Sequence, residues 1–200
     1  DYLENFTGLE ASGACKIIDA SEGQKVIRHL ESFTGLDHNE IAHKLIDIGD
    51  GWSVAYNLEK FISLDTSVAH KLIDGGYSLS VAKNLESFTG LDHNEIVRKI
   101  IDVGEGWGIG AILENFTGLD ASIAHKLIDD GYGCAVACSL ESFTGLDHNE
   151  IAHKLIDIGD GESVAYSLDK FTGLDYNEIA HKLIDIGDGR SVAKNLESFT

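Results

Sequence analysis

Lysine and aspartate recur along the chain at a fixed spacing that could serve phosphate binding. A Lys returns every 27 or 28 residues, and an Asp follows each one three positions later, as in Lys44 and Asp47. The lysines of this column are Lys16, Lys44, Lys71, Lys99, Lys126, Lys154 and Lys182. Opposite charges three or four positions apart on a helix attract each other by about 0.2–0.5 kcal/mol. We therefore predict intrahelical pairs on a neutralised, solvated face rather than a phosphate track.

Histidines raise the question of a metal site, which their spacing does not support. His38 and His43 are five positions apart, whereas a zinc-protease helix carries its two histidines at i and i+4. Equivalent histidines on neighbouring helices lie about 8–10 Å apart, too far to share an ion whose bonds are about 2 Å long. The Asp47–Gly51 loop has glycine where a calcium loop needs oxygen ligands. No nucleophile–base arrangement recurs either, so we expect no metal, no cofactor and no enzyme activity.

A loop glycine recurs in most copies of this pattern, and the residues around it vary. The position of Gly49 is glycine in six copies and Ser21 in the first. The varying positions hold Ile48, Val103, Asp130, Gln24, Trp52, Leu79, Trp107, Glu162, Arg190, Tyr77 and Tyr132. Exposed aromatic residues on loops are typical contact anchors. We predict that these eleven residues form a recognition surface, with the alternative that the Trp rings cover helix ends locally.

These residues sit in a tandem repeat that fills the chain. A Phe-Thr-Gly-Leu segment or a close variant returns at spacings of 27, 28, 27, 28, 27, 28 and 28 residues. The repeats are 6–32, 33–60, 61–87, 88–115, 116–142, 143–170 and 171–198, with 1–5 as the end of a preceding repeat and 199–200 as the start of another. Short (27-residue) and long (28-residue) repeats alternate, except that the last repeat is long.

Each repeat has the pattern of two short helices. Asp37 is a good N-cap, and Glu40 three residues later completes a capping box. Apolar residues then follow at helical spacing on both sides of the glycine loop, with Leu45 before it and Leu58 after it. Helices of about ten residues are not stable alone in water. They must bury their apolar stripes against neighbouring repeats, which predicts an all-α solenoid.

Composition limits the classes of partner. The 200 residues include 15 basic and 34 acidic side chains, a net charge of −19, which disfavours generic binding to nucleic acid or anionic lipid. No apolar run approaches the roughly 20 residues needed to cross a bilayer, so we expect no membrane association. Three cysteines are too few for a disulfide framework and indicate the cytoplasm or another reducing compartment. Cys134 and Cys138, one turn apart, are expected to be small buried or half-buried residues.

The Lys44-Leu45-Ile46 segment before the loop and Gly51 within it resemble the repeats of TAL-effector-like DNA-binding proteins. The resemblance covers nearly the whole chain. It implies a right-handed superhelix around duplex DNA, with one base read by each inter-helix loop, and delivery to a host cell. We therefore predict an all-α fold, a right-handed α-solenoid of 27–28-residue helix-turn-helix repeats.

Three functions remain open on the sequence. We place first a binding scaffold that presents its variable loops to a protein or peptide, favoured to be basic by the chain's acidity. The second is TAL-effector-like binding of duplex DNA, although alignment puts the base-reading position on the Gly49 column and a carboxylate, Asp50, beside it. The third is a structural array whose copies associate end to end.

Overall fold

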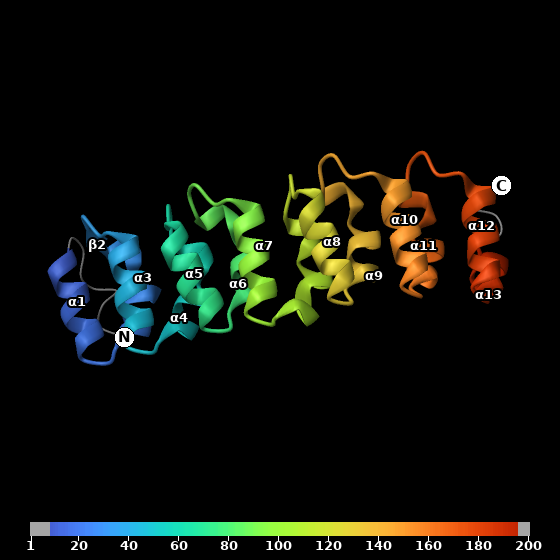
Figure 1. Ribbon diagram of the computed structural model, residues 1–200. Coiled ribbons are helices and arrows are strands. Elements are labelled where there is room, and N and C mark those ends of the chain that lie inside the picture. Colours follow the sequence, from blue (N-terminus) through green and yellow to red (C-terminus); the bar gives the residue numbers. More distant parts are fainter. Residues whose placement is uncertain (1–8, 196–200) are drawn as a thin grey trace. The chain divides into compact units, whose positions relative to one another are not determined.

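The computed structural model describes residues 9–195, apart from the side chains of residues 106 and 107, and is mostly helical (Figure 1). Its described part contains 13 α-helices and one two-stranded sheet. This confirms the predicted all-α class. The partial repeats expected at 1–5 and 199–200 lie outside the described residues.

The first helix of each repeat has nine or ten residues, as predicted. These helices are α1 (Ala11–Asp19), α3 (His38–Asp47), α5 (Thr66–Asp74), α7 (His93–Asp102), α8 (Ala121–Asp129), α10 (His148–Asp157) and α12 (Tyr176–Asp185). The Asp37 side chain accepts hydrogen bonds from the backbone N–H groups of Asn39 and Glu40 at 2.9 and 3.4 Å, which confirms the N-cap. The Glu40 carboxylate instead accepts from the Cys15 thiol at 3.7 Å. The capping box is therefore only half formed in this repeat.

The second helix is shorter than predicted, because it breaks into a six-residue α-helix and a three-residue 3₁₀ turn. The α-helices are α2 (Gly23–Arg28), α4 (Gly51–Tyr56), α6 (Ser78–Lys83), α9 (Gly133–Cys138), α11 (Gly161–Tyr166) and α13 (Gly189–Lys194). The 3₁₀ turns are η2 (Leu30–Ser32), η3 (Leu58–Lys60), η4 (Leu85–Ser87), η6 (Leu113–Asn115), η7 (Leu140–Ser142) and η8 (Leu168–Lys170). At one break, the Asn57 side chain donates to the Ser53 carbonyl at 2.9 Å, a side-chain bond that competes with continued helix.

Two positions with a positive φ set the turns of the repeat. Gly49 between the helices has φ +88°, and Ser21 at the same position of the first repeat has φ +64°. Gly35 also has a positive φ, +65°, but it follows the extended residues of β2 (Phe33–Thr34) rather than a helix end. Gly35 therefore does not cap a helix, although it adopts the left-handed backbone that glycine favours.

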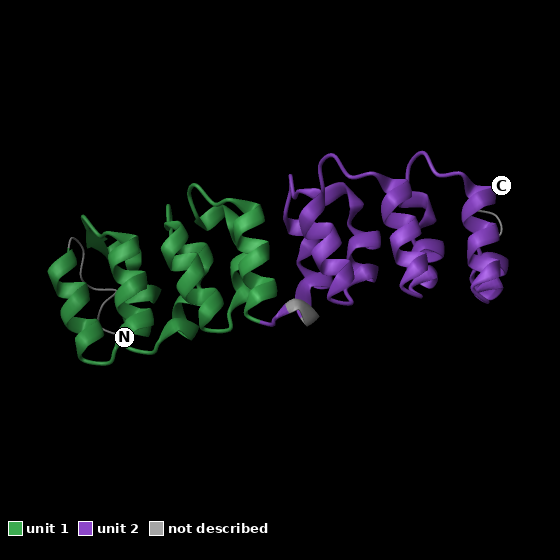
Figure 2. Cartoon of the chain, viewed as in Figure 1, with its two compact units in different colours: residues 1–103 green, residues 104–200 purple. Residues whose placement is uncertain are grey.

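Within each unit, the core lies between the two helices of a repeat and between successive repeats. Leu45 and Leu58 are completely buried, as are Val54 and Leu72. The chain divides into two compact units, residues 1–103 and 104–200 (Figure 2). In the first unit, α1, α3, α5 and α7 contact one another in sequence order, and so do α2, α4 and α6. In the second, α9, α11 and α13 contact in order, and α10 contacts α12.

The boundary between the units falls inside the repeat 88–115. Its second helix, η5 (Gly106–Ala111), is a 3₁₀ helix rather than an α-helix. Three glycines at 106, 108 and 110 explain this difference, because each weakens an α-helix by about 1 kcal/mol relative to Ala.

Candidate interaction surface

Five lysines of the column pair with the aspartate of the preceding repeat rather than with the Asp three residues later. Lys44 Nζ lies 2.6 Å from Asp19 of the preceding repeat, and this hydrogen bond raises the pKa of Lys44. Equivalent pairs at 2.5–2.7 Å are Lys71–Asp47, Lys99–Asp74, Lys154–Asp129 and Lys182–Asp157. The predicted intrahelical pairing was wrong, because side chains lean toward the helix N-terminus and a Lys leans away from an Asp three residues later. The amines are thus held by neighbouring repeats, an arrangement we call the Lys–Asp ladder.

A histidine and an asparagine at the start of long repeats hold the backbone of the next repeat. His38 Nδ1 accepts a hydrogen bond from the Ile62 N–H at 3.0 Å. Asn39 accepts from the Asp65 N–H at 2.7 Å and donates to the Ser63 carbonyl at 3.3 Å. Burial of the ring lowers the pKa of His38. We call this pair of residues the His–Asn clamp.

The clamp recurs in the second unit. His148 Nδ1 accepts from the Thr172 N–H at 2.9 Å, and Asn149 donates to the Gly173 carbonyl at 3.1 Å. The repeat that His148 holds is itself long, whereas the repeat that His38 holds is short. The clamp therefore belongs to the upstream repeat and does not depend on the length of the one it holds.

Short repeats join the next repeat through a parallel backbone pair instead. The Leu64 N–H donates to the Ser87 carbonyl at 2.9 Å, and the Thr89 N–H donates to the Leu64 carbonyl at 2.8 Å. Leu119 pairs with Phe143 in the same way, and β1 (Leu9–Glu10) pairs with β2. The missing residue of a short repeat thus removes the clamp and brings two backbones together. Alternating repeat length corresponds to two alternating junctions.

The second histidine column also faces the next repeat. His43 Nε2 lies 3.0 Å from the Ser67 hydroxyl. His70, His125 and His153 lie 3.3–3.5 Å from Glu95, Glu150 and Glu178 of the following repeat. The contact between His70 and Glu95 is not a hydrogen bond, because the Nε2 atom of His70 has no hydrogen-bond partner. Recurring polar side chains of the first helices are therefore occupied between repeats.

The predicted recognition residues fall on three sets of positions. Ile48, Val103 and Asp130 cap the first helices at their C-terminal ends and are exposed. The second position of the second helix is exposed in every repeat whose side chain is described there: Gln24, Trp52, Leu79, Cys134, Glu162 and Arg190. We call this set the first outward column. Trp107 belongs to it by position, but its side chain lies outside the described residues.

The two tyrosines are less exposed than predicted. Tyr77 and Tyr132 are half-buried at the N-caps of α6 and α9. A Cβ placed on Gly51 or on Gly75 would lie 3.1 Å from the Tyr77 ring. The ring therefore packs against the backbone of the preceding repeat and of its own loop, which explains its partial burial.

A second outward column, which the sequence reasoning missed, runs one helical turn further along the same helices. It holds Arg28, Tyr56, Lys83, Ala111, Cys138, Tyr166 and Lys194. Tyr56 and Tyr166 are 70% and 76% exposed. Trp52, itself 52% exposed, stacks on Tyr56 with ring centroids 5.2 Å apart. The i, i+4 relation to the first column was the signal that could have revealed it.

An acidic column accompanies these two. The second residue of each described terminal 3₁₀ turn is an exposed carboxylate: Glu31, Glu59, Glu86, Glu114, Glu141 and Asp169. Neighbouring turns η3 and η4 contact each other, as do η6 and η7. Within the part of the chain described, only Glu141 of this column forms an ion pair, with Lys170 at 3.7 Å. Unlike the Lys–Asp ladder, the acidic column is thus largely uncompensated.

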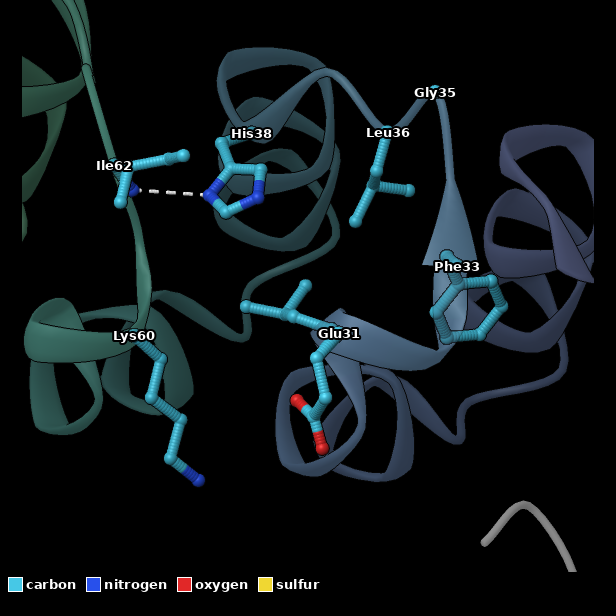
Figure 3. A pocket seen from close by; sticks show the side chains of 8 residues that line it. Glu31, Phe33, Gly35, Leu36, His38, Lys60 and Ile62 are labelled. Carbon is cyan, nitrogen blue, oxygen red and sulfur yellow. Dashed lines mark hydrogen bonds between the residues drawn. The ribbon is translucent and has the colours of Figure 1, made fainter. Parts of the chain in front are cut away.

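Grooves lie between repeats in each unit. In the first unit, Phe33, Leu36 and Ile62 line a groove together with the charged side chains of Glu31 and Lys60 (Figure 3). In the second unit, Glu162 of the first outward column and Ile186 line a groove together with the Gly187–Asp188 loop. A residue of the first outward column and a loop residue of the next repeat therefore lie on one surface.

Comparison with known proteins gives no family for the chain: no family model, curated protein or solved structure matches it. In residues 9–195, no helix is long and apolar enough to cross a bilayer. The same described residues contain no group of three or more His, Cys, Asp or Glu side chains placed to hold a metal ion.

Proposed function

We propose that the chain is a non-enzymatic binding scaffold whose repeats stack as a right-handed α-solenoid. Its partner is a basic protein or peptide that lies on the two outward columns. The acidic column supplies the charge that attracts this partner.

One observation carries the proposal: most positions that vary between repeats are exposed, while the recurring lysines, histidines and asparagines of the first helices contact neighbouring repeats. Trp52, Tyr56 and Leu79 present apolar surface on helices α4 and α6, which contact each other. The Lys–Asp ladder and the His–Asn clamp occupy recurring side chains. In a repeated scaffold, exposed variation with aromatic side chains is the composition of a contact surface.

Charge favours a basic partner over duplex DNA. Phosphate binding needs Lys or Arg side chains that can neutralise the phosphates and release the counterions condensed on DNA. Five lysines of the recurring column already lie within 2.7 Å of an aspartate. The acidic column adds a carboxylate in each repeat where it is described. Complementary charge of this kind accelerates association, and the acceleration weakens as salt is added.

Tryptophan fluorescence tests the proposal. The Trp107→Phe variant leaves Trp52 as the single reporter on the outward columns. We expect a Lys/Arg-rich peptide to change its emission in a saturable manner, more tightly at about 20 mM than at about 200 mM salt. A mixed-sequence duplex should produce no saturable change. Fluorescence titration of both ligands gives the comparison.

Matched charge variants assign the surface. Glu59→Gln with Glu86→Gln should weaken peptide binding, whereas Glu10→Gln with Glu40→Gln changes the net charge equally outside the acidic column and should weaken it less. Saturable DNA binding with a steep negative salt slope would favour the TAL-effector-like function instead. No response to either ligand, together with concentration-dependent association of the chain, would favour a structural array.

A further inference from the structure

Cysteines fill both outward columns of a single helix. Cys134 and Cys138 are the second and sixth residues of α9, one helical turn apart. Cys134 is exposed and Cys138 half-buried, so the expectation of burial was wrong for Cys134. The remaining cysteine of the chain, Cys15, lies in the first repeat on α1. Two of the three thiols are therefore brought together on one accessible face.

The side chains around this pair of cysteines are polar. The next second helix, α11, presents Ser163, and Ser167 follows that helix. The Cys138 thiol lies 3.4 Å from the Ser167 hydroxyl, and the Cys134 thiol interacts with Ser163 and with Cys138. Lys170 donates a hydrogen bond to the Cys138 carbonyl. The Cys138 thiol thus lies beside a hydroxyl group, and the Cys134 thiol interacts with both a hydroxyl group and the other cysteine.

We propose that Cys134 and Cys138 form a two-coordinate site for a thiophilic monovalent cation such as Cu(I). Side chains at i and i+4 on a helix have Cβ atoms about 5–6 Å apart, and metal–thiolate bonds are about 2.3 Å long. Two sulfurs can therefore approach one ion from opposite sides without moving the helix. Soft thiolate ligands select Cu(I), zinc and iron–sulfur clusters over harder ions.

Zinc does not suit this pair, because structural zinc takes four ligands in a tetrahedron. In the described chain no third His, Cys, Asp or Glu completes such a set here. Hydroxyl groups such as those of Ser163 and Ser167 are hard, neutral donors that add little for a soft ion. The low coordination number and the soft ligands together favour Cu(I) over zinc at this site.

Charge balances in the binding step. Two S–H bonds break, two S–Cu bonds form and two protons pass to solvent, while copper remains in the +1 state. The resulting bis-thiolate complex carries one negative charge. Partial burial of the thiol raises the pKa of Cys134. The hydrogen bond with the Ser163 hydroxyl lowers this pKa, whereas Cys138 and Asp160 raise it further. Without the ion, this thiol therefore stays protonated at neutral pH.

The test is anaerobic titration of the full chain with Cu(I) against a competing chelator, in a Cys15→Ser background. We expect one equivalent to bind, with a thiolate-to-copper absorption band in the ultraviolet. Cys134→Ser and Cys138→Ser should each weaken binding by at least about tenfold, the loss that even an outer-shell substitution produces. Ag(I), an ion of equal charge, should compete for the site.

A gain-of-site variant makes the geometry testable. Glu162 and Tyr166 occupy the same two columns on α11, so Glu162→Cys with Tyr166→Cys should add a second equivalent of Cu(I). Circular dichroism of each variant checks that the helices remain. Retention of tight binding by either single Ser variant, or equally tight binding of Zn(II), would overturn the proposal.

Discussion

At the scale of the residue, the first glycine of a second helix is fixed by a neighbour that belongs to another repeat. A Cβ on Gly133 would lie 2.5 Å from Leu155 Cδ2 and 2.5 Å from Asp160 Oδ2. Leu155 is completely buried, and the Asp160 carboxylate accepts from the Ser163 hydroxyl at 2.5 Å. Neither group can move aside easily. The positive φ of its turn explains Gly49. Sequence reasoning could not show the close approach at Gly133, because the contacting atoms are more than twenty residues away.

Two glycine substitutions should therefore have opposite effects. Gly133→Ala should destabilise the chain by about 1–3 kcal/mol, since it overpacks a filled space. Gly13 lies inside α1 with nothing within 4 Å of its added Cβ, and Gly13→Ala should stabilise by about 0.5–1 kcal/mol. Urea unfolding of both variants measures the difference. Equal effects would show that the repeats do not pack as described.

The outward columns also show the limit of prediction from single residues. Trp52 was found because it varies beside the loop, whereas Tyr56 was missed even though it lies one turn away on the same face. The acidic column was missed because Glu59 and its equivalents hardly vary, and variation was the criterion. Exposure depends on which side the next repeat covers, so constant surface residues cannot be separated from buried ones by pattern alone.

At the scale of the element, the helices were predictable and the junctions were not. Asp37 capping and the buried Leu45 stripe follow from local sequence. The His–Asn clamp depends on the backbone of the following repeat, where Ile62 and Asp65 present free N–H groups. The alternation of 27- and 28-residue repeats was visible in the sequence. The two kinds of junction that it produces depend on which backbone segments of neighbouring repeats pair, and the sequence does not show this.

The clamp predicts a pH dependence of stability. His38 Nδ1 must be unprotonated to accept from Ile62, and burial lowers the pKa of His38 below its ordinary value near 6.5. Between the folded and unfolded pKa values, the unfolded chain holds a proton that the folded chain does not. Stability from this group is therefore complete above about pH 6.5 and is lost as the pH falls toward the folded pKa.

Urea unfolding of the wild type and His38→Ala at about pH 7.5 and about pH 5.5 checks this sign, the two values lying on either side of the ordinary His pKa. The variant should lose less stability on acidification than the wild type. Asn39→Ala is the matched control, because it removes the other half of the same clamp and leaves the imidazole in place. Its stability loss on acidification should match that of the wild type. A steeper acid loss in His38→Ala would contradict the clamp.

At the scale of the whole molecule, stability should rise with the number of repeats. Each repeat buries its leucines against neighbours, and its ladder and clamp bonds all cross to another repeat. A peptide of residues 33–60 should therefore be unfolded, while chains of two, four and six repeats should unfold at increasing urea concentrations. Circular dichroism measures both. A well-folded single repeat would contradict a stacked array.

The type of each junction is set by its upstream repeat, and this affects how the number of repeats in the gene can change. A clamp made by His148 grips a long repeat as readily as His38 grips a short one. Unequal recombination that deletes or duplicates the gene segment for one repeat therefore leaves every surviving copy with a working connection to its new neighbour. Such a gene can change copy number in steps of a single repeat without compensating mutations. The outward columns, including any pair of thiols, can then be shuffled into new orders while the joints between repeats are preserved.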